Sequence, residues 1–193
     1  NSVMGLLPLP HVRPVGGKIL FEGIDLLTLT EPQMRELRGR RIGMVFQEPM
    51  TALNPVMRIG EQIGEVFDAH MNVPAEEKRQ RILAALADVG LPDPELLIDA
   101  YPFRLSGGQR QRVMIACALI LEPVLLICDE PTTALDVTTP AQILKLVREL
   151  QQRRGTAVLF ITHDFGVVSE IADHVVVMQT GQVVEAGPAR DVL

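Results

Sequence analysis

Two adjacent carboxylates, Asp129 and Glu130, directly follow the apolar run 125–128. A short apolar run of this kind is typical of a buried strand, and open α/β sheets bind ligands beyond the carboxyl ends of their strands. An Asp in that place can hold hydrated Mg²⁺, and the next carboxylate can act as general base for an attacking water. The pair predicts hydrolysis of a nucleotide γ-phosphate, although an Asp-Glu pair after a strand is also common as a loop start and helix cap.

A second group of residues has the composition of a phosphate-binding turn. Ser106, Gly107, Gly108 and Gln109 lead into the apolar run 114–121. This order predicts a helix with its N-cap at Ser106, whose free backbone N–H groups favour an anion, while the two glycines allow a ligand close to the main chain. A phosphate is the expected ligand. A capped surface helix would have the same residues.

Two further polar residues each follow an apolar run that predicts a strand. Gln47 comes after the run 42–46, and His163 comes shortly after the run 157–161. Because the carboxyl ends of parallel strands lie at one edge of a sheet, we expect both residues on the same edge as Glu130. There His163 could donate to a γ-phosphate, and Gln47 could contact the metal or the water.

The surrounding pattern predicts an α/β fold. Apolar runs 124–128, 157–161 and 175–178 alternate with helices expected at 141–150 and 165–172, which implies a parallel sheet with right-handed crossovers. A turn at 179–181 leads to a last strand at 182–185. Nearer the N-terminus we expect the tail of a helix at 2–7, a strand at 18–22, a capped helix at 30–37 and a strand at 41–46.

A helical lobe interrupts this pattern. Ile59, Ile63, Val66 and Phe67 share one helix face, and Ile82, Leu83, Leu86 and Val89 share another that Gly90 closes as a C-cap. We therefore expect residues 49–113 to form a helical subdomain inserted into a core made of residues 1–48 and 114–193.

Composition excludes several classes of protein. Hydrophobic residues make up 47% and aromatic residues 4% of the chain, which favours an aliphatic α/β core. The net charge of −6 and the lack of a basic block disfavour nucleic acid as a partner. Cys117 and Cys128 lie in apolar runs, so we interpret them as buried thiols of a reducing compartment. The most apolar window, 113–128, contains Glu122 and Pro123 and is too short for a membrane span.

Taken in order along the chain, these motifs resemble those of the ATP-binding cassette (ABC) ATPases. That family implies a RecA-like P-loop NTPase core with an inserted α-helical subdomain, and it implies ATP and Mg²⁺ as ligands. The resemblance assigns the following residues: Gln47 to the Q-loop, Ser106, Gly107, Gly108 and Gln109 to the signature, Asp129 to the Walker B magnesium carboxylate, Glu130 to the catalytic base, Asp136 to the D-loop and His163 to the switch histidine.

A narrower resemblance covers residues 45–55, 57–62 and 130–138, which are similar to the ATPase subunits of oligopeptide, dipeptide and nickel importers. It implies a bacterial protein, peripheral at the cytoplasmic face of the inner membrane. Its partners would be a second ABC ATPase subunit, two transmembrane permease subunits and, indirectly, a periplasmic substrate-binding protein, with no nucleic acid. A coupling helix of the permease would dock on the loop after Gln47 and the helical lobe. In the ATPase dimer, each signature would contact the nucleotide of the other subunit.

One expected motif is absent from these 193 residues. The family's phosphate loop ends in Gly-Lys-Ser or Gly-Lys-Thr, but the only lysines are Lys18, Lys78 and Lys145, and none lies in such a loop. Gly17 and Lys18 come nearest, but Ile19 follows them. We therefore expect the sequence to begin just after the Walker A loop, with a core that is incomplete at its N-terminus. On its own this fragment should neither bind MgATP tightly nor hydrolyse it.

Two alternatives stay open. A non-transport ABC-type ATPase would share the motifs, but the repair type separates its halves by a long coiled coil and the translation type carries two cassettes. The other alternative is a non-catalytic docking module that uses the helical lobe as its binding surface.

Overall fold

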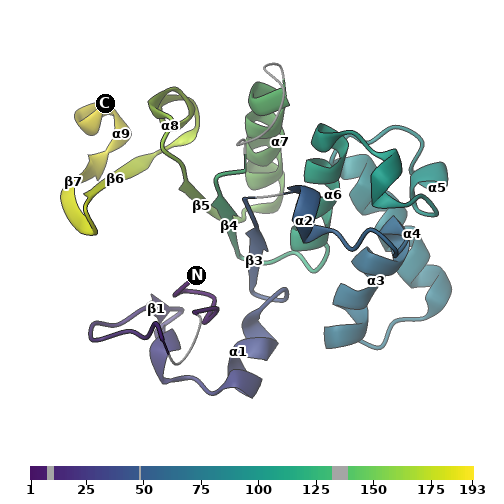
Figure 1. Ribbon diagram of the computed structural model, residues 1–193, viewed down its shortest axis with the longest axis horizontal. Helices are drawn as coiled ribbons and strands as arrows, with labels where there is room; N and C mark the ends of the chain where they lie inside the picture. Colours follow the sequence, from purple (N-terminus) through teal and green to yellow (C-terminus); the bar gives the residue numbers. More distant parts are fainter. Residues whose placement is uncertain (8–10, 48, 132–138) are drawn as a thin grey trace.

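The protein is described here by a computed structural model that covers residues 1–7, 11–47, 49–131 and 139–193. Its centre is a three-stranded parallel sheet in the order β3 (Ile42–Val45), β4 (Leu125–Asp129) and β5 (Ala157–Ile161) (Figure 1). Val45 pairs with Cys128, and Cys128 pairs with Phe160. The three strands therefore end at the same edge, which confirms the predicted strands and the α/β class.

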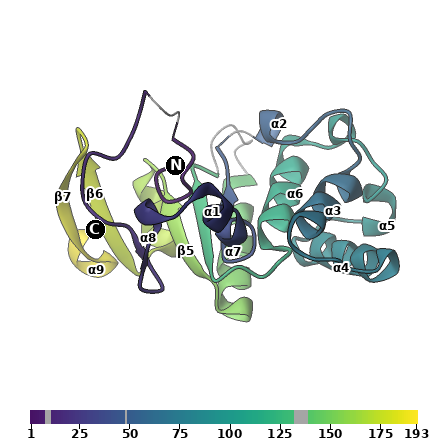
Figure 2. The same cartoon turned by 90° about the horizontal axis from the view of Figure 1, so that it is seen from below.

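The two faces of the sheet are covered by different parts of the chain. Val45, Leu126 and Cys128 point to one face, where they join a core cluster formed with α6 (Gly107–Leu119) and α7 (Thr139–Arg154). Ile42 and Ile127 point to the other face, where Met4, Leu26 and Met34 cover them. This alternation follows from the period of two along a strand. Figure 1 shows α7 above and α1 (Glu31–Leu37) below the sheet, and in Figure 2, seen from below, α1 lies in front.

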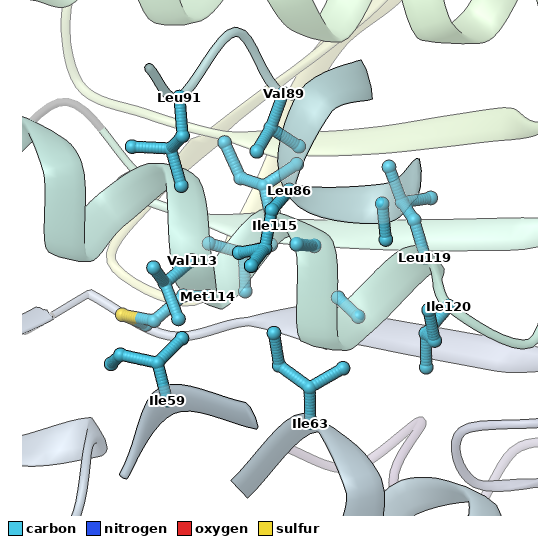
Figure 3. Packing of buried hydrophobic residues seen from close by; sticks show 14 of the residues in the cluster. Ile59, Ile63, Leu86, Val89, Leu91, Val113, Met114, Ile115, Leu119 and Ile120 are labelled. Carbon is cyan, nitrogen blue, oxygen red and sulfur yellow. The ribbon is translucent and has the colours of Figure 1, made fainter. Parts of the chain in front are cut away.

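The helical part of the chain comprises α2 (Pro49–Ala52), α3 (Ile59–His70), α4 (Ala75–Asp88) and α5 (Pro94–Leu97), which lie beside α6. Both predicted apolar faces are confirmed: Ile63 and Leu86 are fully buried and meet Ile115 of α6 (Figure 3). Burying each such side chain contributes about 1.5–3 kcal/mol. Gly90, with φ of 69°, ends α4 as predicted.

The expected parallel placement of the run 175–178 is wrong. β6 (His174–Gln179) instead pairs antiparallel with β7 (Gln182–Pro188), in a two-stranded sheet separate from β3, β4 and β5 within the described residues. The turn explains the difference, because Thr180 and Gly181 both have positive φ, of 48° and 80°. Two successive positive φ values make a tight hairpin that sends the chain straight back. The predicted turn and last strand are confirmed, and α8 (Phe165–Ile171) precedes the hairpin.

The N-terminal segment departs once from expectation. Residues 2–7 form turns rather than the tail of a helix, with Met4 N–H donating to the Asn1 carbonyl and Gly5 in the left-handed region at φ of 63°. After it, β1 (Leu20–Phe21) and β2 (Ile24–Asp25) form a short antiparallel pair, and a 3₁₀ turn covers Leu26–Thr28. The capping box between Thr30 and Gln33 at the start of α1 is confirmed.

Two 3₁₀ or short helical pieces complete the described chain: the 3₁₀ turn Pro102–Arg104 before α6, and α9 (Ala189–Val192) after β7. Among the helices of the described residues, none combines the length and the apolar character that crossing a bilayer needs.

Candidate functional site

The carboxylate of Glu130 lies between Gln47 and His163 at the carboxyl edge of the sheet. Gln47 Nε2 donates to Glu130 Oε2 over 3.3 Å, and His163 Nδ1 is 2.9 Å from Glu130 Oε1. The three residues follow β3, β4 and β5 respectively. The sequence predicts these residues at one edge of the sheet. They meet there because the three strands are parallel and end at the same level.

The backbone of Glu130 has an uncommon conformation. Its φ is 45°, in the left-handed region that costs a non-glycine residue about 1–2 kcal/mol. Its N–H donates to the Ile161 carbonyl over 2.9 Å, which extends the contact between β4 and β5 by one residue. The Glu130 side chain is 23% exposed, so its carboxylate is held by neighbours yet open to a ligand. Strained residues of this kind are concentrated at functional sites.

His163 is the exposed partner of this group, with 77% of its side chain accessible. The hydrogen bond to Glu130 and the charge of that carboxylate raise the pKa of His163 above its ordinary value, with Asp164 adding to the effect. The turn around His163 is fixed on both sides. Thr162 Oγ1 accepts from Asp164 N–H, and Asp164 Oδ1 accepts from Gly166 N–H over 2.8 Å, capping α8. Sequence reasoning gave Asp164 no role, although an Asp directly before a helix is a recognisable N-cap signal.

Asp129 is the last residue of β4 and is partly buried, opposite Ile161. Within the described residues, no group of three or more His, Cys, Asp or Glu side chains could hold a metal by itself. Mg²⁺ commonly takes only one or two protein carboxylates and completes its shell with water and substrate phosphates. Asp129 and Glu130 are adjacent in sequence and Gln47 is hydrogen-bonded to Glu130, so their oxygen donors fit such a set.

The start of α6 is built as predicted, with one difference. Ser106 is the N-cap: its Oγ accepts from Gln109 N–H over 3.3 Å. The Gln109 side chain accepts from Ser106 N–H over 2.9 Å and so completes a capping box instead of pointing to a ligand. A side chain added at Gly107 would meet nothing within 4 Å, so the main chain there is open to an approaching group.

Arg110 fixes this turn by hydrogen bonds, a role that was not predicted from the sequence. Its Nε donates to the Pro102 carbonyl over 2.8 Å and to the Leu105 carbonyl over 3.1 Å. These bonds tie the turn that contains Ser106 to the 3₁₀ turn before it. Ser106 and Gln109 hydrogen-bond to each other, whereas Glu130 contacts Gln47 and His163, so the candidate site has two parts. Asp136, the remaining predicted site residue, lies outside the described residues.

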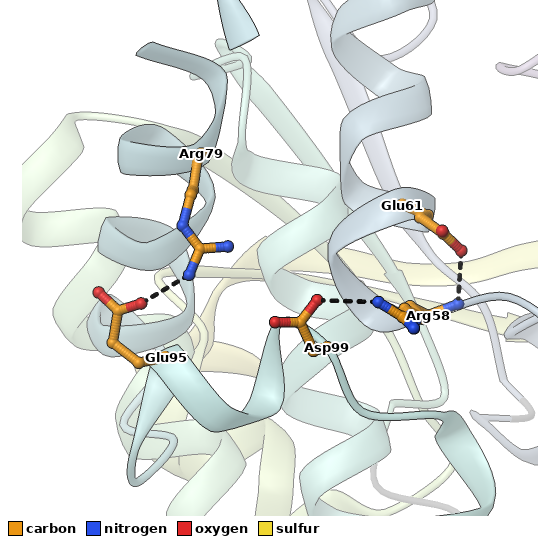
Figure 4. Close-up of polar contacts among 5 residues, drawn as sticks. All are labelled: Arg58, Glu61, Arg79, Glu95 and Asp99. Atoms are coloured by element: carbon orange, nitrogen blue, oxygen red, sulfur yellow. Dashed lines mark hydrogen bonds and ion pairs between the residues drawn. The ribbon is translucent and has the colours of Figure 1, made fainter. Parts of the chain in front are cut away.

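A groove of about 370 Å³ opens next to Gln47, between the end of β3, α2, α3 and α6. Among the described residues its lining is mostly apolar and rich in methionine, and Glu65 is the one acidic residue there. The apolar side chains include those of Met44, Phe46, Leu53, Met57, Val66 and Met114. A second groove, of about 520 Å³, shares Met57 and Glu65 with the first. Figure 4 shows its charged rim, where Arg58 pairs with Asp99 at 3.3 Å and Arg79 pairs with Glu95 at 2.8 Å.

The parallel sheet carries an acidic pair and two polar partners of Glu130 at its carboxyl edge. The sequence matches the ABC transporter family over residues 8–133, and the chain belongs to that family. This result agrees with the resemblance drawn from the motifs, and the fold is that of an ABC ATPase cassette.

Two relatives of the chain have names that refer to transport. The chain is 54% identical to the peptidoglycan transport ATP-binding protein YejF of Agrobacterium fabrum, covering 100% of this chain and 35% of that protein. It is 50% identical to the oligopeptide transport ATP-binding protein OppD of Bacillus subtilis, covering 100% of this chain and 54% of that protein. The chain thus spans between a third and little more than half of these relatives.

Solved structures agree with this assignment. The dimeric post-hydrolysis state of the ATP-binding cassette MJ0796, bound to ADP and Pi, superposes with a TM-score of 0.81 at 29% identity, covering 93% of this chain and 76% of that one. CbiO1 from Clostridium perfringens, part of the transporter complex cbiONQ, superposes with a TM-score of 0.82 at 33% identity, covering 99% and 71%.

Proposed function

We propose that this chain is part of the ATP-hydrolysing subunit of an ABC importer, which couples ATP binding and hydrolysis to the uptake of peptides or a similar small solute. The observation that carries the proposal is the contact of Glu130 with both Gln47 and His163, directly after Asp129. Identity of about half to transport ATP-binding proteins supports the transport role.

In the proposed reaction, Glu130 accepts a proton from water while the water oxygen attacks the γ-phosphorus. The bond from that phosphorus to the bridging oxygen breaks, and ADP leaves. Gln47 orients the water next to Glu130, and His163 donates a hydrogen bond to a γ-phosphate oxygen. Asp129, with Gln47 beside it, would hold Mg²⁺, which when bound would neutralise charge on the phosphates. These four side chains come from the carboxyl ends of three neighbouring strands, so the sheet fixes their spacing.

Ser106, Gly107, Gly108 and Gln109 are proposed to contact ATP through the open main chain at the start of α6, and Asp136 is proposed to belong to the same site. By analogy with the dimeric cassettes among the solved structures, the nucleotide they contact would belong to a second ABC ATPase subunit. A Cβ added at Gly107 would meet nothing within 4 Å, so the main chain there has room for a phosphate.

The groove beside Gln47 is proposed to receive a helix of a transmembrane permease subunit. Its apolar lining would bury the side chains of such a helix, and its position next to Gln47 would transmit docking to the water-orienting residue. The protein would then be a bacterial subunit, peripheral at the cytoplasmic face of the inner membrane, served indirectly by a periplasmic substrate-binding protein. Residues 1–48 and 114–193 are proposed to form the ATPase core, with residues 49–113 as the inserted subdomain.

The test is ATP hydrolysis by the full-length protein with its permease subunits in lipid nanodiscs. Replacing Glu130→Gln should lower kcat by about 10²- to 10⁴-fold, because a general base contributes that much. Glu185→Gln, which removes an exposed carboxylate on β7, is the matched control and should keep full activity. Unchanged hydrolysis by Glu130→Gln would rule out Glu130 as the base, and no hydrolysis by the parent protein would favour the non-catalytic docking module.

A further inference from the structure

Gln111 is completely buried in α6, and neither its side-chain oxygen nor its side-chain nitrogen has a hydrogen-bond partner. The other buried polar residue of the described chain behaves as expected, because Thr156 Oγ1 donates to the Pro123 carbonyl over 3.1 Å. Buried side-chain amides without partners are rare in native proteins. The C=O and the NH₂ group each lose their hydrogen bonds to water on burial and gain none in the protein. Gln111 therefore requires an explanation.

The position of Gln111 shows what it lies near. Gln111 and Ala118 are seven residues apart, so they lie two turns apart on the same face of α6. That face packs on the sheet, because a Cβ added at Gly43 would lie only 2.4 Å from the Ala118 carbonyl oxygen. α6 ends beside the start of β4, and so it runs antiparallel to the strands. Gln111 is consequently about 10 Å nearer to the carboxyl edge than Ala118 is.

The same helix connects the two other features of the site. Its first turn carries Ser106 and Gln109, and Arg110 fixes that turn to the chain before it. Further along, Met114 and Cys117 line the groove beside Gln47. Gln111 lies between these two contacts, in the turn of α6 that any pull on the signature or any docking in the groove would have to move.

We propose that Gln111 is a positioning residue whose amide gains its hydrogen-bond partners only when MgATP engages the site, through a shift of α6 against the carboxyl edge of the sheet. This inference rests on the proposed function. In the nucleotide-free protein the unpaired amide destabilises the present packing of α6, and pairing with main-chain groups at the edge stabilises the engaged packing. Gln111 touches neither the nucleotide nor the water. It acts through the placement of Gln47, Glu130 and the signature.

The test compares Gln111→Met with Ile115→Met in the full-length protein with its permease subunits. Methionine keeps the length of glutamine but cannot pair, and Ile115 is a fully buried apolar neighbour one turn further along α6. For Gln111→Met we expect the nucleotide-free unfolding midpoint to rise by about 2–4 °C, because an unpaired amide is removed. We expect kcat for ATP to fall about tenfold, because the engaged packing of α6 loses the bond that forms when MgATP engages the site. Ile115→Met should keep the parent kcat.

An unchanged or lowered midpoint for Gln111→Met would overturn the inference, because the amide would then be paired without nucleotide. Gln111→Leu repeats that measurement with a different shape, and failure of both variants to fold counts the same way. An unchanged kcat also overturns it. The proposed function fails separately, if the parent protein does not hydrolyse ATP. In that event the size of the MgATP-induced rise in midpoint, expected to be smaller in Gln111→Met than in the parent, still decides the role of Gln111.

Discussion

Glu130 and His163 are joined by a contact of 2.9 Å between Oε1 and Nδ1, although they end different strands. The parallel pairing of β4 and β5 creates this contact, because Asp129 lies opposite Ile161 and both strands then end at the same edge of the sheet. The left-handed backbone of Glu130 gives its carboxylate a direction that a continued strand would not. The Glu130 carboxylate and its imidazole partner are thus both held by backbone geometry.

The first prediction concerns the charge of His163. Its pKa in the folded protein should lie above the ordinary 6.5, because the Glu130 carboxylate accepts its hydrogen bond and favours the protonated ring. Glu130→Gln should bring the pKa back toward 6.5, whereas Glu170→Gln on α8 should leave it unchanged. Titration of the imidazole carbon-bound protons by NMR measures both.

The same shift sets the sign of a stability effect. Because the folded pKa is raised, the stabilisation from this pair is fully present below the unfolded pKa of about 6.5 and is lost as the pH rises through the folded value. The difference in stability between the parent protein and Glu130→Gln should therefore narrow as the pH rises above that value. A difference that widens with rising pH would contradict the contact.

The second prediction concerns the contact between α6 and the sheet. A methyl group at Gly43 would lie 2.4 Å from the Ala118 carbonyl oxygen and 3.1 Å from the Pro123 ring, so Gly43→Ala forces the helix away from β3. The expected loss of stability is about 1–3 kcal/mol. Gly16→Ala is the control, because an added methyl group there meets nothing within 4 Å. Urea unfolding should separate the two variants, and equal midpoints would refute the close approach.

The third prediction concerns the two thiols. Burial raises the pKa of Cys117 and of Cys128 to about 12, so both stay protonated at neutral pH. Because the thiolate is the reactive form, both cysteines should react slowly with a thiol reagent such as dithionitrobenzoate in the native protein. Cys128 is buried and should react only on the timescale of opening, whereas Cys117 is half-buried on the groove beside Gln47 and should react faster than Cys128. In denaturant both cysteines should react at once. Rapid modification of Cys128 in the native protein would mean that the packing around it is looser than described.

Much of the site could be predicted from the sequence because strand direction carries the information. Apolar runs followed by Gln47, Glu130 and His163 place those residues at one edge whenever the strands are parallel. The N-cap Ser106 was recognisable for a similarly local reason, since a helix start favours a serine in that place, whereas the capping role of Gln109 was not predicted.

What could not be predicted depends on pairing and on tertiary contacts. An apolar run such as that of β6 fits a parallel or an antiparallel partner equally well, and the sequence does not show that β6 pairs with β7 and not with the parallel sheet among the described strands. The unpaired amide of Gln111 cannot be inferred from the sequence either. Its helical position puts it on the buried face, but the missing partner is a property of what lies across from it.

The last prediction concerns the 193 residues as a separate polypeptide. They include Asp129, Glu130 and His163 but no Gly-Lys-Ser or Gly-Lys-Thr sequence, the loop that cradles the β- and γ-phosphates in P-loop ATPases. Without those main-chain and lysine contacts, the carboxyl edge has little to hold the phosphate chain, and its own carboxylates repel it. Calorimetric titration with MgATP should detect no binding at micromolar concentrations, and phosphate release should equal that of the Glu130→Gln variant. Micromolar affinity with turnover that Glu130→Gln abolishes would mean that this polypeptide holds the phosphates by other residues.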